Sequence, residues 1–150
     1  PDDQLLSLLN PLLEKENIEV PQDSEWIHKA LTIFKTKMET LNDAIELFKP
    51  IDMRYFNISE EAQEALSWEN TAKVFSAWKK EVEAMRSDYM TGDEFAEAQN
   101  RVKEASVVKG KHLFMPIRIA IIGKPHGADL KMLVPLIKKD SLLERLSKCY

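Results

Sequence analysis

The 150-residue chain is poor in cysteine and glycine and has no long apolar run. One cysteine, Cys149, excludes an internal disulfide bond and fits a reducing compartment, so we expect a cytoplasmic protein. No apolar stretch reaches the roughly 20 residues of a membrane span, and no signal peptide opens the chain. With only four glycines and abundant leucine, alanine, glutamate and lysine, the composition favours helices. A start at Pro1 rather than methionine suggests a fragment of a longer protein.

The net charge of −4 hides a division between the two halves of the chain. Residues 1–75 hold 15 acidic and 7 basic side chains, a net charge of −8, whereas residues 76–150 hold 10 and 14, a net charge of +4. The bias is strongest in residues 98–150, with 4 acidic and 11 basic side chains. A polyanion would be attracted to this end. Charge alone leaves open that these lysines and arginines only keep the surface soluble.

Prolines and capping residues divide the acidic half into short helices. A short helix is expected just before Pro11, which should then start a second turn. Asp23 or Ser24 should cap the next helix, because apolar residues then recur at three- and four-residue steps. The apolar residues that form this stripe are Ile27, Leu31, Phe34 and Met38.

A further helix in this half should begin at Thr40, with Asp43 three residues later, and end at Pro50. Residues 51–57 are irregular and aromatic, which is typical of a hinge. We therefore expect a first helical subdomain over residues 1–57 and a second over residues 58–150.

The second subdomain should contain a long helix capped by Ser67. Trp68, Phe75 and Val82 then fall at seven-residue spacing. These aromatic residues could form a platform for stacking bases, but the spacing is the usual one of a seam between packed helices, which we favour. Further helices are expected after Thr91 or Asp93 as far as about Val107, from Asp129 to about Ile137, and from Asp140 or Ser141 to near Lys148.

Residues 117–122 give conflicting signals. Their β-branched side chains favour a strand, whereas Pro116 suits the start of a helix and Gly123 its end. No second strand of similar quality exists to pair with this segment, and a lone strand cannot satisfy its backbone hydrogen bonds. We therefore predict a helix starting at Pro116, with Arg118 and Ile122 on its more exposed face.

No catalytic constellation emerges from the sequence. The three histidines lie at no metal-ligand spacing with one another or with Cys149. Gly123 and Lys124 are followed by Pro125, so they do not form a phosphate-binding loop of the usual type. A catalytic pair among the many carboxylates stays open, although their positions suit a solvated surface. The pattern favours a binding module.

Several short motifs extend over nearly the whole chain. They are Lys37-Met38-Glu39-Thr40-Leu41, Tyr55-Phe56, Pro116-Ile117-Arg118-Ile119-Ala120, Gly123, His126-Gly127, Leu130 and Leu143-Glu144-Arg145-Leu146. Each motif is weakly specific, but their order and spacing are more so. Together they resemble the anticodon-binding end of bacterial glutamyl-tRNA synthetases.

The resemblance implies an all-α pair of small helical subdomains that forms an anticodon-binding helix bundle. In that family the ATP and amino-acid sites lie in an upstream domain with His-x-Gly-His-like and Lys-Met-Ser-Lys-Ser-like motifs, and neither motif is present here. This fragment should therefore bind no cofactor and should not aminoacylate by itself. The parent glutamate–tRNA ligase would use ATP and Mg²⁺. We expect a monomer that binds glutamate tRNA and no membrane.

The resemblance also implies the residues that read the anticodon. Arg118 would contact the first base, the Gly127 and Ala128 backbone would meet the middle base, and Leu130 would pack nearby. An arginine has a planar fork of donors, and glycine lets a backbone approach a base closely. Single-stranded loops expose the base edges that such groups recognise. The lysines expected to steer phosphates are Lys109, Lys111, Lys124 and Lys131.

Lys37 departs from many members of the family, which carry an arginine at the position that reads the third anticodon base. Lysine is a point donor without the planar fork. We hypothesise that discrimination at this base is relaxed and that the parent charges glutamine tRNA as well. The alternative for the whole chain, from another class of protein, is a non-enzymatic helical adaptor whose basic end meets an acidic protein.

Overall fold

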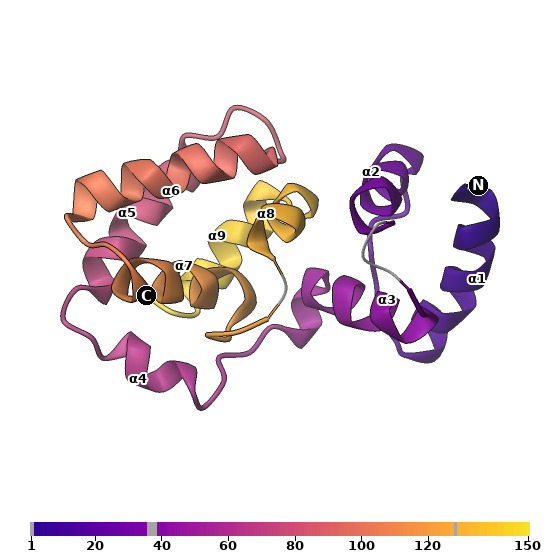
Figure 1. Ribbon diagram of the computed structural model, residues 1–150, viewed down its shortest axis with the longest axis horizontal. Coiled ribbons are helices and arrows are strands. Elements are labelled where there is room, and N and C mark those ends of the chain that lie inside the picture. Colours follow the sequence, from indigo (N-terminus) through magenta and orange to yellow (C-terminus); the bar gives the residue numbers. More distant parts are fainter. Residues whose placement is uncertain (1, 36–38, 128) are drawn as a thin grey trace. The chain divides into compact units, whose positions relative to one another are not determined.

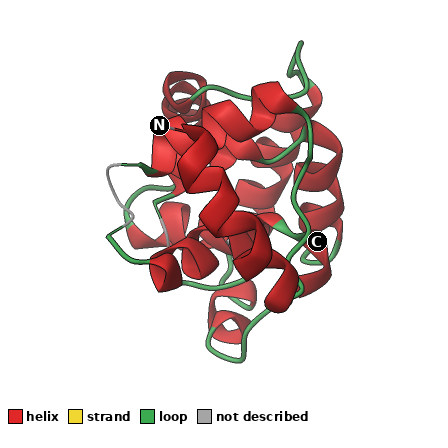
Figure 2. Ribbon diagram, turned by 90° about the vertical axis from the view of Figure 1, so that its right-hand side faces the viewer, coloured by secondary structure: helices red, strands yellow, loops and turns green. Residues whose placement is uncertain are grey.

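The computed structural model describes residues 2–35, 39–127 and 129–150. Within those ranges the chain forms helices and loops and no strand (Figures 1 and 2), so the all-α prediction is confirmed. It divides into two compact units, Pro1–Tyr55 and Phe56–Tyr150. None of the described helices is both long and apolar enough to cross a membrane.

Aromatic side chains form the core of the first unit. Phe48 lies with its ring centroid 5.1 Å from that of Phe34 and 6.3 Å from that of Trp26, and all three are buried. Leu9 and Leu13 add the apolar face of the first helix. The helices of this unit are α1 (Asp2–Lys15), α2 (Ser24–Phe34) and α3 (Leu41–Phe48), followed by the short 3₁₀ helices η1 (Lys49–Ile51) and η2 (Met53–Tyr55).

The helix starts of the first unit follow local side-chain chemistry. Asp23, one of the two expected caps, is the N-cap of α2 and accepts a hydrogen bond from the backbone N–H of Trp26 at 2.8 Å. Thr40 caps α3, and Asp43 bonds back to the backbone of Thr40, which completes a capping box. Both capping predictions are confirmed.

The prediction for Pro11 is wrong, because α1 runs through this residue without a restart. Proline removes one backbone donor and crowds the preceding turn. Leu9 and Leu13 lie on either side of Pro11, and both are buried. Burying such side chains gains about 2 kcal/mol each, which offsets much of that cost and keeps the two turns in one helix.

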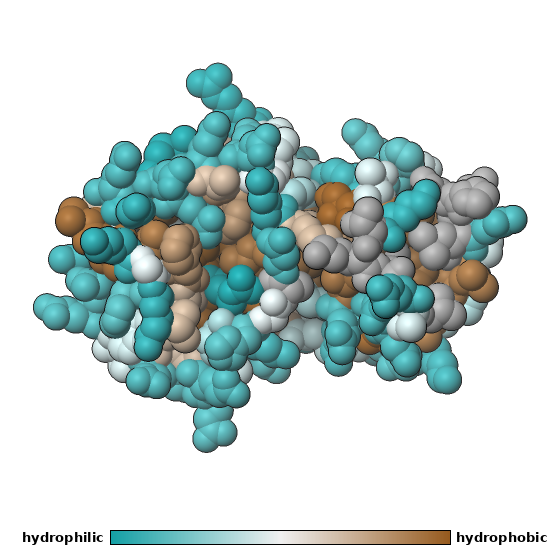
Figure 3. Space-filling model, in the orientation of Figure 1, coloured by the Kyte–Doolittle hydropathy of each residue, from teal (hydrophilic) through white to brown (hydrophobic). Residues whose placement is uncertain are grey.

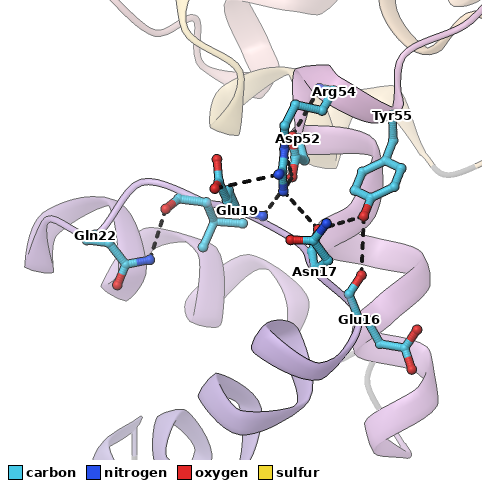
Figure 4. A network of polar contacts seen from close by, with 8 residues as sticks. Glu16, Asn17, Glu19, Gln22, Asp52, Arg54 and Tyr55 are labelled. Atoms are coloured by element: carbon cyan, nitrogen blue, oxygen red, sulfur yellow. Dashed lines mark hydrogen bonds and ion pairs between the residues drawn. The ribbon is translucent and has the colours of Figure 1, made fainter.

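A polar network closes the first unit (Figure 4). The buried Asp52 carboxylate accepts hydrogen bonds from the backbone N–H of Glu19 at 2.7 Å and from the backbone and side chain of Arg54. Arg54 Nη2 and the Tyr55 hydroxyl both donate to the backbone carbonyl of Asn17, at 2.8 and 2.6 Å. The network therefore fastens the end of the unit to the connection between α1 and α2.

The second unit is built around α7 and α5. In Figure 1, α4 lies on one side of α7 and α6 on the other, with α5 between α6 and α7. α7 also packs against α9, and α8 packs against α6. The helices are α4 (Ala62–Leu66), α5 (Thr71–Glu83), α6 (Gly92–Ser106), α7 (Lys111–Ile122), α8 (Leu130–Leu133) with η3 (Val134–Leu136), and α9 (Lys139–Ser147).

The aromatic pattern of α5 belongs to the core. Phe75, Trp78 and Val82 are buried, and the Trp78 ring packs edge-on against a ring of α6 at 5.7 Å, so the helix-seam interpretation is confirmed for α5. Trp68 lies before α5 and is half-buried, with its ring centroid 4.3 Å from that of His112. The predicted start is wrong, because Ser67 ends α4 and donates its hydroxyl hydrogen to the Glu64 carbonyl, while α5 begins at Thr71.

The helix prediction for residues 117–122 is confirmed, but α7 begins at Lys111, so Pro116 lies inside it. Leu113, Ile117 and Ile121 are almost fully buried, and packing on both sides of the proline holds the two parts in one helix. Arg118 is half-buried, but Ile122, expected on the same more exposed face, is buried.

Caps elsewhere in the second unit follow the sequence only in part. Thr91 caps α6 and Asp129 caps α8, as predicted, and Glu94 completes a capping box with Thr91. The helix that starts after Asp129 is shorter than predicted, because α8 ends at Leu133 and residues 134–136 form η3. α9, by contrast, begins at Lys139, before either expected cap.

Candidate nucleic-acid interface

The C-terminal end of α7 is tightly enclosed. Gly123 adopts a left-handed conformation (φ 76°), and its N–H donates to the Ile119 carbonyl at 2.8 Å. A Cβ atom at Gly123 would lie 2.0 Å from the backbone oxygen of Asn57. The backbone N–H of Ser59 donates to the Gly123 carbonyl at 2.9 Å. Glycine is therefore required here on two counts, its backbone conformation and the absence of space for a side chain.

The 123–130 loop leaves this point towards solvent. Lys124, His126 and Gly127 are exposed, whereas Pro125 is buried. Gly127 has φ 147°, and a Cβ atom there would meet Ile122 Cδ1 at 2.9 Å. The loop thus exposes a basic side chain and a bare stretch of backbone while one proline anchors it. Such a surface can approach a planar ligand closely.

Arg118 lies half-buried on α7, one helical turn before Ile122. Residues four apart share one face of a helix, and Ile122 is the side chain next to Gly127. The face of α7 that carries Arg118 therefore leads to the exposed part of the loop.

Leu130 and Asp129 mark the far end of the loop. Asp129 accepts a hydrogen bond from the backbone N–H of Lys131 at 2.9 Å and so starts α8. Leu130 is only 5% exposed, because it packs into the core. Its role is consequently to anchor the loop, and little of its side chain is open to a ligand.

All four lysines expected to steer phosphates are exposed. Lys109 and Lys111 lie at the N-terminal end of α7, where Lys111 Nζ is 5.5 Å from the centroid of the Trp68 ring. Lys124 follows the C-terminal end of α7, whereas Lys131 lies on α8, with its Nζ 3.7 Å from an exposed Asp93 oxygen at the start of α6. The face drawn in Figure 3 is largely hydrophilic. The exposed lysines could attract a polyanion.

Two predicted readers, Lys37 and Ala128, lie outside the described residues. The sequence places Arg145 in one of the motifs but does not indicate its contact with the last turn of α7. Arg145, on α9, is fully buried and donates from Nη1 to the Ile121 carbonyl at 2.7 Å. Its spacing from Leu142 and Leu146 places it on the buried stripe of α9, and an arginine on such a stripe is the signal that could have revealed it.

The described residues contain no group of three histidine, cysteine, aspartate or glutamate side chains placed to hold a metal ion. Burial raises the pKa of the Cys149 thiol to about 11, so at neutral pH it is protonated and a poor nucleophile.

Comparison with known proteins defines the class. Residues 4–150 match the family described as "Anticodon binding domain". The chain belongs to this anticodon-binding domain family.

The relatives within this class are glutamate–tRNA ligases. The chain is 50% identical over 145 residues to the glutamate–tRNA ligase of Bdellovibrio bacteriovorus, and the aligned region covers 97% of this chain and 30% of that protein. It is 34% identical over 124 residues to the glutamate–tRNA ligase of Listeria innocua, and this alignment covers 81% of this chain and 25% of that protein. The chain thus spans about 30% or less of the length of these relatives.

The fold is similar to a crystal structure of a glutamate tRNA ligase from Elizabethkingia meningosepticum in complex with its amino acid. The TM-score is 0.77 at 19% sequence identity, over 99% of this chain and 28% of that one. These comparisons confirm the resemblance to the anticodon-binding region of glutamyl-tRNA synthetases, and they do not favour a protein-interaction adaptor.

Proposed function

We propose that this chain is the anticodon-binding part of a glutamate–tRNA ligase and that its partner is glutamate tRNA. The observation that carries the proposal is the 50% identity to such a ligase across 97% of the chain. The whole protein would attach glutamate to tRNA in the cytoplasm as a monomer, using ATP and Mg²⁺ in another domain. The two compact units would be its first and second helical subdomains, with the anticodon-reading end in the second.

Recognition in this proposal uses the C-terminal end of α7 and the 123–130 loop. The Arg118 guanidinium would donate to the edge of the first anticodon base. The backbone at Gly127 and Ala128 would approach the middle base, and Leu130 would hold the loop from the core side. Support comes from the exposed Gly127 and from the Ile122 contact that brings the Arg118 face to it. A bidentate arginine contact gives roughly 1–3 kcal/mol of base discrimination.

The four lysines would contribute affinity rather than specificity. Each phosphate contact releases a counterion, so replacing one lysine should weaken binding to every RNA sequence alike. For example, Lys124→Ala should reduce the slope of log affinity against log salt concentration by about 0.7.

The specificity experiment compares two RNA hairpins, the anticodon stem-loop of glutamate tRNA and the same hairpin with all three anticodon bases replaced. We expect the chain to prefer the first, and Arg118→Ala to reduce that preference about tenfold. Arg101→Ala is the matched control, because it removes an equal charge from α6, where Arg101 pairs with Glu81 at 2.7 Å. Equal binding of both hairpins by the unsubstituted chain would contradict the proposal.

Lys37 carries the remaining hypothesis, that the third base is read loosely and glutamine tRNA is also charged. The resemblance implies an arginine at this position in many family members. Lys37 lacks the planar fork of that arginine and offers a point donor instead. The full-length enzyme and its Lys37→Arg variant should be compared in charging both tRNAs. We expect the substitution to raise the preference for glutamate tRNA about tenfold. A strong preference that the substitution leaves unchanged would overturn this hypothesis.

A further inference from the structure

The second unit contains a fully buried arginine beside the proposed reading loop. Arg145 donates from Nη1 to the Ile121 carbonyl at 2.7 Å and from Nε to the Ser141 hydroxyl oxygen at 3.1 Å. Its guanidinium lies over the ring of Phe56, 5.6 Å from the centroid. One side chain therefore joins α9, the last turn of α7 and the first residue of the second unit.

Stability alone is a weak reason for an arginine at this place. Burying a charge costs solvation free energy, and apolar replacements of buried charges are often neutral or stabilising. The guanidinium fixes the orientation of the groups that it contacts, because its donors lie in one rigid plane. The last carbonyl groups of a helix lack partners within the helix and carry partial negative charge. Arg145 supplies both a donor and a positive charge at that position of α7.

Two carbonyl groups just before the loop are thus held from different directions. Arg145 holds that of Ile121 from α9, and the backbone N–H of Ser59 holds that of Gly123. Asn57 closes the remaining side, because its oxygen occupies the space of a Gly123 side chain. The exposed part of the 123–130 loop begins at the next residue, Lys124. The direction in which the loop leaves α7 is therefore set by these contacts.

We propose that Arg145 is a positioning residue for anticodon recognition, which orients the 123–130 loop without touching the RNA. This inference rests on the proposed function of that loop. Removing the fork frees the last turn of α7 to move at Gly123, so the loop samples orientations that do not match the bases. The exposed lysines are unaffected, so attraction to phosphates persists while base discrimination falls.

The binding test uses the 150-residue chain and the two hairpins described above. Arg145→Met fills the space without donors, and we expect it to reduce the preference for the natural anticodon about tenfold with an unchanged salt slope. Arg145→Lys keeps the charge and an N–H donor group without the planar fork, and should retain part of the preference. Ser141→Ala removes one acceptor and should reduce it about twofold. Arg101→Met, a surface arginine replaced in the same way, should leave the preference unchanged.

A merely structural role predicts a different pattern. Partial unfolding would weaken binding to both hairpins equally and leave their ratio intact. The folding of Arg145→Lys and Ser141→Ala is checked by their melting temperatures. If these folded variants bind both hairpins more weakly but in an unchanged ratio, the inference is overturned, even if Arg145→Met fails to fold.

Hydrogen exchange separates this inference from the proposed function, because it needs no RNA. In Arg145→Lys we expect amides of residues 119–127 to exchange about tenfold faster, with those of α5 unchanged. Faster exchange without any hairpin preference in the unsubstituted chain would support the positioning role and contradict anticodon reading. Unchanged exchange in residues 119–127 would overturn the positioning role.

Discussion

Among the residues that the structure describes, each unit has one almost fully buried charged side chain, and the two have different tasks. Asp52, 5% exposed, is surrounded by donors at the edge of the first unit, and its partner Arg54 is itself exposed. Arg145, 0% exposed, reaches from α9 to α7 inside the second unit. A unit of 55 residues can bury only a small core. In the first unit the charged Asp52 therefore helps to hold the end of the unit against the connection between α1 and α2. In the larger unit the charged Arg145 orients the C-terminal end of α7.

The largest expected effect tests the enclosed end of α7. Gly123→Ala places a Cβ atom 2.0 Å from the Asn57 oxygen at positive φ, so the backbone must move. We expect a loss of about 3 kcal/mol or more in the free energy of unfolding, measured by urea titration. Gly110→Ala is the control without a close approach, since φ is also positive at +66° but no atom lies within 4 Å of the new Cβ. Its ψ of −142° lies outside the left-handed helical region, so backbone strain alone should cost about 1–3 kcal/mol. A loss at Gly123 no larger than at Gly110 would show that the close approach at Gly123 is unimportant.

The next effect tests the fastening of the first unit. Asp52→Asn replaces a buried acceptor of several hydrogen bonds by an amide and should cost about 2 kcal/mol. Hydrogen exchange should show the loss in the first unit and not in α5 or α6. Glu19→Gln changes the exposed partner of the same Arg54, 3.6 Å away, and should have little effect. A comparable loss from both substitutions would remove the special role assigned to Asp52.

The same carboxylate should make the first unit sensitive to acid. Burial acts to raise the pKa of Asp52, but hydrogen bonds from Arg54 and from the Glu19 and Arg54 backbone outweigh it, so the pKa lies below its usual value. Below pH 4 the unfolded chain then binds a proton more readily than the folded chain, and stability falls as pH decreases. In Asp52→Asn this part of the acid loss, followed by hydrogen exchange of α1 and α2, should disappear. If Asp52→Asn left the pH dependence of exchange in α1 and α2 unaltered, Asp52 would not be the cause of the acid sensitivity.

The smallest effects compare the two capping boxes, one in each unit. Thr40→Ala and Thr91→Ala each remove the hydroxyl that accepts a backbone N–H, at 3.2 and 3.0 Å. Each should cost about 1 kcal/mol. Exchange should accelerate in α3 for the first substitution and in α6 for the second. If either substitution destabilised both units equally, the units would unfold as one cooperative body.

The features predicted well from the sequence depend on neighbours a few residues away. Asp23, Thr40 and Thr91 were identified as caps because a cap bonds to a backbone N–H within three residues. The helix starts predicted at the two prolines were wrong, because distant packing contacts outweigh the local preference of proline. Pro11 and Pro116 suit a helix start locally, yet both lie inside helices whose apolar residues are buried on either side of the proline.

In the candidate site, too, local features could be predicted from the sequence and long-range contacts could not. Its loop stands out in the sequence through Gly123, Pro125 and Gly127. The contacts that direct the loop do not, because Asn57 and Arg145 are remote from it along the chain.

Composition, periodicity and capping residues thus determine that this chain is helical, where most of its helices start and which end is basic. Those features arise from interactions over one or two helical turns. Tertiary packing alone decided that α7 passes through Pro116, that Leu130 faces the core and that a buried Arg145 meets the Ile121 carbonyl. Such contacts join segments far apart in the chain, and their free energy exceeds the local preferences of single residues.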